Sequence, residues 1–331
     1  MGNRLNSAGR LTFALSLGVA LMAGPWAALG QSTGEAVSRH VNIWSEGTRM
    51  SGDLWVPANA EPGAKLPAIL LTHGWGGVRS HLNSTYAPKF AAAGFIVLAF
   101  DYRGWADSDS RLVIAGEQPT PDASGEVTVR ARAIREVVDP YDQVADISAA
   151  LDFLVGEPQV DTSRIGIWGT SYSGGHALFV GAQDPRIRAI VSQVGYQDSR
   201  EAVRLRFAQQ GGEDFARKRA TQKARGEIAP IPQGIDQFSG LRGTPDIAKM
   251  VHYRPIAVAH RVRAPTLFID QDAEELFDRR NHGLAAYEIV RQHAPARYEL
   301  LPGKHYAVYR DNFERASDLA LAWFREHLGG E

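Results

Sequence analysis

The sequence contains no cysteine among its 331 residues. Disulfide bonds, a thiol nucleophile and a cysteine-ligated zinc site are therefore excluded, and stability must come from the core. Net charge is also scarce: the formal value of −1 offers no basic face for a nucleic-acid backbone, so nucleic acid is not an expected partner. The remaining composition, 44% hydrophobic and 22% charged, is that of a globular protein with a sizeable core.

Long apolar runs are scarce, and the most prominent one lies near the N-terminus. Residues 11–23 (LTFALSLGVALMA) are preceded by Arg4 and Arg10 and followed by a small-x-small site, ALG at 28–30. The run is shorter than the about 20 residues that span a bilayer. We expect a secretory signal peptide over 1–30, in preference to an uncleaved membrane anchor, and a periplasmic or secreted product without stable membrane insertion.

Residues 31–331 alternate short apolar runs with helical patterns, without an internal repeat or a linker that would mark a second domain. This alternation predicts an α/β fold with a mostly parallel eight-stranded sheet and helices on both faces. The expected strands are 40–47, 48–58, 67–75, 95–104, 164–169, 188–195, 265–270 and 298–303, the first two forming an edge hairpin. The principal expected helices are 139–155, with Pro140 in its first turn, and 313–328.

Two stretches interrupt this alternation. Residues 105–138 form a long polar connection, and residues 196–263 separate two strands by far more than an ordinary connection. The second stretch is expected to form a helical cap insertion over the strand ends, where open α/β sheets bind ligands. Its arginines and phenylalanines are interpreted as a solvated helix face, part of which could bind an acidic or aromatic acyl group: Arg204, Arg206, Arg217, Arg219, Arg225, Phe207, Phe215 and Phe238.

Ser171 lies in RIGIWGTSYSGGHAL (164–178), where an apolar strand passes into a helix through small residues. This matches the G-x-S-x-G nucleophile elbow, with Ser173 in place of the second glycine. The strained turn requires small residues two positions to either side, and Gly169 and Ser173 both qualify. The pattern predicts Ser171 as a nucleophile at the positive end of a helix. The alternative is a small residue that merely suits a tight turn.

His305 is the candidate base, because it follows the last expected strand in the stretch PGKH and precedes the final helix. A histidine there could take the proton of the attacking serine. Other histidines occupy positions that suggest structural roles: His40 starts an edge strand, His176 lies in the helix after Ser171, and His293 and His327 lie near helix C-termini.

The acid that orients the histidine is expected after strand 265–270, where several carboxylates cluster. These are Asp270, Asp272, Glu274, Glu275 and Asp278. Aligned on the pattern strand-G-x-x-D, Gln271 replaces the glycine and Glu274 replaces the aspartate. We favour Glu274, and Asp272 and Glu275 remain alternatives.

An oxyanion hole needs two backbone N–H groups directed at one point. Tyr172, directly after the nucleophile, would supply one. The loop HGWGG (73–77) follows the third expected strand, and its glycines allow close approach to a substrate oxygen. Trp75 is the expected second donor.

The order Ser171, Glu274, His305, with HGWGG upstream, resembles the α/β-hydrolase superfamily over residues 38–330. DYRGWADSD (101–109) is similar to the D-x-R-G-x-G-x-S segment of that superfamily, with alanine at the second glycine.

The elbow GTSYSGG (169–175) resembles that of the X-Pro dipeptidyl-peptidase and cocaine-esterase group. Because the chain ends at the helix 313–328, we expect no C-terminal β-domain of that group, and single-domain bacterial esterases are the nearer resemblance.

The resemblance implies an exported serine hydrolase that cleaves a small-molecule carboxylic ester without a cofactor or metal. A peptidase, amidase or thioesterase with the same residues remains an alternative. A non-catalytic binding module on the same fold is a further one.

Overall fold

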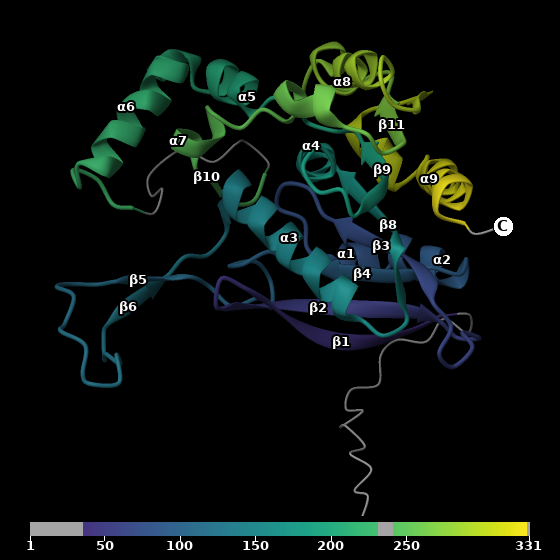
Figure 1. The fold of residues 1–331 in the computed structure, drawn as a ribbon. Coiled ribbons are helices and arrows are strands. Elements are labelled where there is room, and N and C mark those ends of the chain that lie inside the picture. Colours follow the sequence, from purple (N-terminus) through teal and green to yellow (C-terminus); the bar gives the residue numbers. More distant parts are fainter. Residues whose placement is uncertain (1–35, 231–240, 330–331) are drawn as a thin grey trace, which may run out of the picture.

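The computed structural model describes residues 36–230 and 241–329 (Figure 1). The expected signal peptide and Phe238 of the expected cap lie outside the described residues. The central sheet has eight strands in the order β1-β2-β4-β3-β8-β9-β11-β12. The β1–β2 and β2–β4 pairs are antiparallel and the other pairs are parallel. The expected mostly parallel eight-stranded sheet is therefore confirmed.

All eight expected strands belong to this sheet. They are β1 (Ala36–Ser45), β2 (Thr48–Pro57), β3 (Leu66–Thr72), β4 (Ile96–Phe100), β8 (Val160–Thr170), β9 (Ile187–Gln193), β11 (Thr266–Gln271) and β12 (Ala296–Leu301). Glu46 and Gly47 join β1 to β2 with φ of 47° and 79°, the two positive values of a type I′ hairpin turn. Strand β8 starts earlier than expected because Val160 already pairs with Leu66 of β3.

The sheet is covered on both faces, which explains why its inner strands are continuous apolar runs. In β4, Ile96, Leu98 and Phe100 join one buried cluster, and the alternate residues Val97 and Ala99 join another. Helices α3 (Pro140–Gly156), α4 (Tyr172–Gly181) and α8 (Gly283–Val290) contribute to the first cluster. Helices α1 (Arg79–Asn83), α2 (Tyr86–Ala92) and α9 (Phe313–Leu328) contribute to the second.

Helix α3 begins where the sequence predicts. Asp139 caps it by accepting hydrogen bonds from the N–H groups of Tyr141 and Asp142, and Pro140 occupies the first helical position. Proline suits this position because its missing N–H would have no intrahelical acceptor.

Residues 105–138 are more structured than the expected polar connection. Strands β5 (Leu112–Ile114) and β6 (Ala131–Ala133) form an antiparallel hairpin that projects from the body of the molecule (Figure 1). Strand β7 (Val137–Val138) then pairs in parallel with β10 (Thr244–Pro245). These strands are short, and several of their apolar side chains are exposed, so they lack the pattern of a buried strand.

The stretch 196–263 contains α5 (Ser199–Arg206), η1 (Ala208–Gln210), α6 (Glu213–Ala224), α7 (Ile247–Met250) and η2 (Pro255–Arg261). Helices α5, α6 and α7 contact one another and lie together at one end of the molecule (Figure 1). Two 3₁₀ turns, η3 (Arg279–Asn281) and η4 (His305–Tyr309), follow β11 and β12. Within the described ranges, no helix is both long and apolar enough to cross a membrane.

Candidate active site

Ser171 occupies the sharp turn between β8 and α4. Its φ of 54° and ψ of −123° are unusual for a residue with a side chain, as expected for strain stored at a functional turn. The turn is held from the neighbouring strand, since the Ser171 N–H donates to the Gln193 carbonyl at 2.8 Å. The Ser171 carbonyl in turn accepts from the Tyr196 N–H at 3.0 Å.

The elbow was expected to need small residues two positions before and after Ser171, but only the position before it is restricted to glycine. A Cβ on Gly169 would lie 2.0 Å from the Ser173 carbonyl oxygen, so only glycine fits there. Ser173 carries a side chain and is nevertheless accommodated with 1% exposure. Farther along α4, a Cβ on Gly175 would lie 2.1 Å from the Tyr196 carbonyl oxygen, which allows α4 to approach the segment after β9 closely.

Ser171, His305 and Glu274 come together in one line of hydrogen bonds. His305 Nε2 lies 3.1 Å from Ser171 Oγ, and His305 Nδ1 lies 2.7 Å from Glu274 Oε2. The side chains of Glu274 and His305 are each only 2% exposed. An ionised carboxylate can only accept, so His305 Nδ1 carries the hydrogen and Nε2 presents its lone pair to the serine hydroxyl.

The two alternative acids have different partners. Asp272 accepts a hydrogen bond from the backbone N–H of Gly303 at 2.8 Å. Glu275 accepts from the backbone N–H of His305 at 2.8 Å, and so contacts the main chain of the histidine where Glu274 contacts its ring. The three neighbouring carboxylates of the loop between β11 and α8 therefore each bind a different group, and Glu274 is the one that binds the His305 ring.

The loop HGWGG after β3 lies against the elbow. A Cβ on Gly74 would lie 2.7 Å from the Ser171 Cβ, so the glycine is what permits this approach. The rings of Trp75 and Tyr172 meet edge to face with 5.3 Å between centroids. Tyr172 is the first residue of α4, and its N–H is among those that a helix leaves without an intrahelical acceptor.

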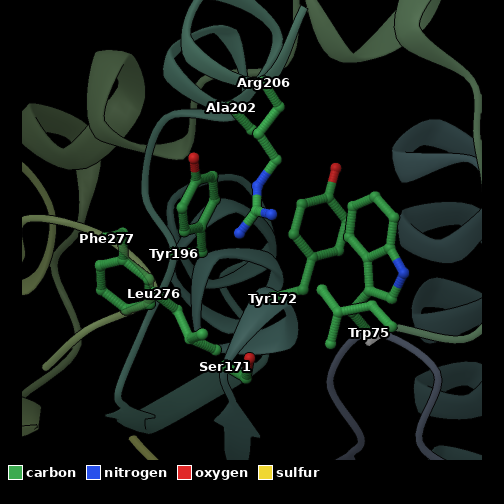
Figure 2. A pocket seen from close by; sticks show the side chains of 9 residues that line it. Trp75, Ser171, Tyr172, Tyr196, Ala202, Arg206, Leu276 and Phe277 are labelled. Atoms are coloured by element: carbon green, nitrogen blue, oxygen red, sulfur yellow. The ribbon is translucent and has the colours of Figure 1, made fainter. Parts of the chain in front are cut away.

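A pocket opens directly above Ser171 (Figure 2). Its described lining comes from the HGWGG loop, the elbow, the segment after β9, α5, the residues before β10 and the segment after β11: Trp75, Ser171, Tyr172, Tyr196, Ala202, Arg206, Leu241, Leu276 and Phe277. In Figure 2 the guanidinium of Arg206 extends from α5 toward the space between Tyr196 and Tyr172. Arg206 thus lines the pocket, whereas Arg217 lies on the exposed side of α6.

The aromatic wall of this pocket is supported by a buried histidine that the sequence did not predict. Tyr196 stacks on His282, with 4.3 Å between ring centroids, and Phe277 meets the same imidazole edge to face at 4.9 Å. His282 is fully buried; its Nδ1 accepts from the Gln197 N–H at 2.8 Å, and its Nε2 contacts the Glu201 carboxylate. No local motif marks this contact, because Glu201 and His282 are far apart in the sequence.

His176 is buried in α4 and has a structural role. Its Nε2 lies 3.0 Å from Gln143 Oε1 and its Nδ1 lies 2.7 Å from the Tyr253 hydroxyl. Burial lowers the pKa of His176 to about 3, so the imidazole is neutral and joins α4 to its neighbours. Over the described part of the chain, no cluster of three or more histidine or acidic side chains is placed to hold a metal ion.

Comparison with known proteins agrees with this geometry. The model of the X-Pro dipeptidyl-peptidase (S15) family matches residues 46–307. The chain belongs to this family. The resemblance of the GTSYSGG elbow to the X-Pro dipeptidyl-peptidase group is therefore confirmed, and the S15 protein described here is a hydrolase of the α/β type.

Individual relatives extend the comparison along the chain. An uncharacterized 31.7 kDa protein of the traX-finO intergenic region of Escherichia coli is 28% identical over an alignment of 291 residues that covers 81% of this chain and 93% of that protein. The thiohydrolase aneE of Aspergillus aculeatus is 29% identical over 147 residues, 44% of this chain and 38% of its own. The crystal structure of the hypothetical protein PA2218 from Pseudomonas aeruginosa superposes with a TM-score of 0.65 at 22% identity, covering 91% of this chain and all of that one.

Proposed function

We propose that this S15 protein is an exported serine hydrolase that cleaves carboxylic esters through an acyl-enzyme on Ser171. The observation that carries the proposal is the line of hydrogen bonds from Glu274 through His305 to Ser171, at the floor of a pocket. A serine alone is a weak nucleophile, and a neighbouring base with an orienting acid is the arrangement that activates it.

In the proposed reaction, Ser171 Oγ attacks the acyl carbon while His305 Nε2 takes its proton. Glu274 holds the ring in place and stabilises the imidazolium that forms. The N–H groups of Trp75 and Tyr172 stabilise the negative oxygen of the tetrahedral intermediate. His305 then gives its proton to the leaving alcohol oxygen, the carbon–oxygen bond breaks, and water repeats the sequence on the acyl-enzyme to release the acid.

The lining of the pocket favours an ester over an X-Pro peptide. A dipeptidyl-peptidase must bind the protonated terminal amine of its substrate, which calls for a carboxylate. The lining residues that the structure describes include no carboxylate, and they do include the cationic Arg206, which would repel an ammonium group. A thioester remains the second candidate, because a relative carries the name thiohydrolase.

The test is the turnover of 4-nitrophenyl acetate by the wild type and by Ser171→Ala. The loss expected for a serine triad is on the order of 10⁶-fold in kcat. Ser148→Ala, which removes a serine of α3 whose hydroxyl bonds to the Val144 carbonyl, serves as a control with unchanged turnover. Wild-type turnover by Ser171→Ala would refute the mechanism. A matched acetyl ester, thioester and anilide, with an X-Pro anilide, would then rank the leaving groups, and we expect the ester to be cleaved with the highest kcat/KM.

The proposed export depends on the charged and apolar pattern of the N-terminal residues. Expression of the full chain in a bacterium with a periplasm, followed by osmotic shock, tests it. We expect esterase activity in the shock fluid and a mature N-terminus at Gln31. Retention of the intact chain in the cytosol would contradict export while leaving the catalytic proposal unaffected.

A further inference from the structure

Ser173, the residue that replaces the second glycine of the elbow motif, makes two buried hydrogen bonds. Its Oγ lies 2.5 Å from the His73 carbonyl oxygen and 2.7 Å from the Tyr102 hydroxyl. A carbonyl can only accept, so the Ser173 hydroxyl gives its single proton to His73. Tyr102 must then donate to Ser173, and a hydroxyl that lies between them satisfies both partners.

These partners lie on separate segments of the site. Ser173 is the second residue of α4, directly after Tyr172, and His73 opens the loop that carries Trp75. The Ser173–His73 bond therefore joins the two segments that carry the two proposed oxyanion donors. Gly74, the next residue of that loop, is the one that lies against Ser171.

Tyr102 adds a third segment, the one that follows β4. Its ring meets the His73 imidazole edge to face with 4.5 Å between centroids, and both residues are almost completely buried. Burial raises the pKa of the Tyr102 hydroxyl well above its usual value, so it keeps the proton that it donates. Burial lowers the pKa of His73 to about 4, so no charge forms at this junction near neutral pH.

We propose that Ser173 is a positioning residue whose hydroxyl sets the spacing of the oxyanion hole. It ties the loop of Trp75 to the first turn of α4, so that the two N–H groups point to one place before substrate arrives. The glycine of the usual motif cannot make this bond and would leave the buried His73 carbonyl without its donor. The inference rests on the proposed function, since it concerns the same oxyanion.

The test compares Ser173→Ala and Ser173→Gly with the wild type, using enzyme counted by titration with a fluorophosphonate. A misplaced oxyanion donor reduces the stabilisation of the transition state more than it reduces the binding of the substrate. We expect kcat for 4-nitrophenyl acetate to fall about 10- to 100-fold with KM within about twofold. The inhibition constant of phenylboronic acid, whose tetrahedral adduct presents an anionic oxygen, should rise in parallel. Ser173→Gly restores the common motif, so its folding does not depend on a new side chain.

Ser108→Ala is the matched control. Ser108 is also 2% exposed or less, donates to a carbonyl (Asp101, 2.6 Å) and accepts one hydrogen bond (Ser51 N–H, 2.9 Å). Ser108→Ala should lower the melting temperature of the protein and leave its kcat for 4-nitrophenyl acetate unchanged. The inference is overturned if both Ser173 variants keep kcat within twofold of the wild type, or lose no more than Ser108→Ala does. A wild type that the fluorophosphonate does not label would instead refute the proposed function, and this inference with it.

Discussion

At the scale of single residues, the loop after β11 shows how a carboxylate acquires a role from its position. Glu274, Glu275 and Asp272 differ little in chemistry, yet Glu274 alone of these three contacts the imidazole Nδ1 of His305. A carboxylate there fixes the tautomer that can accept the serine proton, whereas a carboxylate on a backbone N–H shapes the loop.

Substitution of each acid by its amide should separate these roles. We expect Glu274→Gln to lower kcat for 4-nitrophenyl acetate by roughly 10²- to 10⁴-fold, because the amide keeps the shape but no longer stabilises the imidazolium. Asp272→Asn and Glu275→Gln should lower it by less than about tenfold. Steady-state kinetics measure the three values. A larger loss in Asp272→Asn or Glu275→Gln than in Glu274→Gln would contradict the assignment.

Asp270, near the end of β11, predicts a dependence of stability on pH. It is buried, and the Tyr298 hydroxyl donates to it at 2.8 Å. Burial, with a smaller contribution from the nearby Glu274 carboxylate, raises the pKa of Asp270 from 3.8 to about 7. Between about pH 4 and 7 the folded protein therefore keeps a proton that the unfolded chain releases. The free energy of unfolding should fall as the pH rises through this range.

Asp270→Asn tests this expectation, because asparagine resembles the protonated acid and its oxygen can still accept from Tyr298. The melting temperature of the variant should change less between pH 4 and pH 7 than that of the wild type. Differential scanning calorimetry at several pH values gives the comparison. Parallel curves for the two proteins would show that Asp270 does not hold the proton.

At the scale of elements, the segment after β4 contains a strained turn. Ala106 has a φ of 38°, a value that favours glycine, and it stands where the related D-x-R-G-x-G-x-S segments have one. Gly104 in the same turn has a φ of 77°, and a Cβ there would lie 2.5 Å from the Ile134 carbonyl oxygen. Positions 104 and 106 thus share a backbone with positive φ, but only position 104 carries the glycine that suits it.

Ala106→Gly should relieve the strain and raise the free energy of unfolding by about 0.5–1 kcal/mol. Gly104→Ala, the matched change in the opposite direction, should lower it by more than that because it adds a clash. Urea denaturation measures both values. Destabilisation by Ala106→Gly would mean that the backbone at this turn is not strained.

The segment 196–263 and the sheet are linked at the pocket by a second element-scale feature. Glu201 of α5 contacts the buried His282, and His282 supports Tyr196 and Phe277 in the pocket wall. Helix α5 therefore lines the pocket with Ala202 and Arg206, and through Glu201 it also holds the histidine behind the pocket wall.

At the scale of the whole molecule, the size of the pocket predicts a preference for short acyl groups. The cavity above Ser171 has a volume of about 40 Å³, well below the roughly 150 Å³ of an apolar cavity that admits benzene. Among 4-nitrophenyl esters we expect the highest kcat/KM for acetate and a value at least about tenfold lower for octanoate. A rise in kcat/KM with chain length would contradict this prediction.

Much of the architecture follows from local sequence. The inner strands of the central sheet are recognisable because both of their faces are buried, and α3 is recognisable from Asp139, Pro140 and its apolar spacing. The β5–β6 hairpin was not predicted, because its strands are short and its apolar residues are exposed. Its form depends on pairing across a long loop, which local patterns do not encode.

The site was predictable to a similar depth. Ser171 and His305 follow from the order of strands and the turns after them. The sequence favoured Glu274 but left Asp272 and Glu275 as alternatives, and the structure brings Glu274 together with His305 and Ser171. The bond from Ser173 to His73 and the support of Tyr196 by His282 join residues far apart in the chain. Such contacts appear only once the segments are packed against one another.

The proposed mechanism depends on Ser171 as the activated nucleophile of this S15 hydrolase. The most direct measurement is the reaction of the folded full chain with a fluorophosphonate, followed by intact mass and peptide mapping. We expect one adduct per chain, located on Ser171, absent in Ser171→Ala and formed far more slowly in His305→Ala. An adduct on another residue, or none on a folded and monodisperse sample, would contradict this expectation.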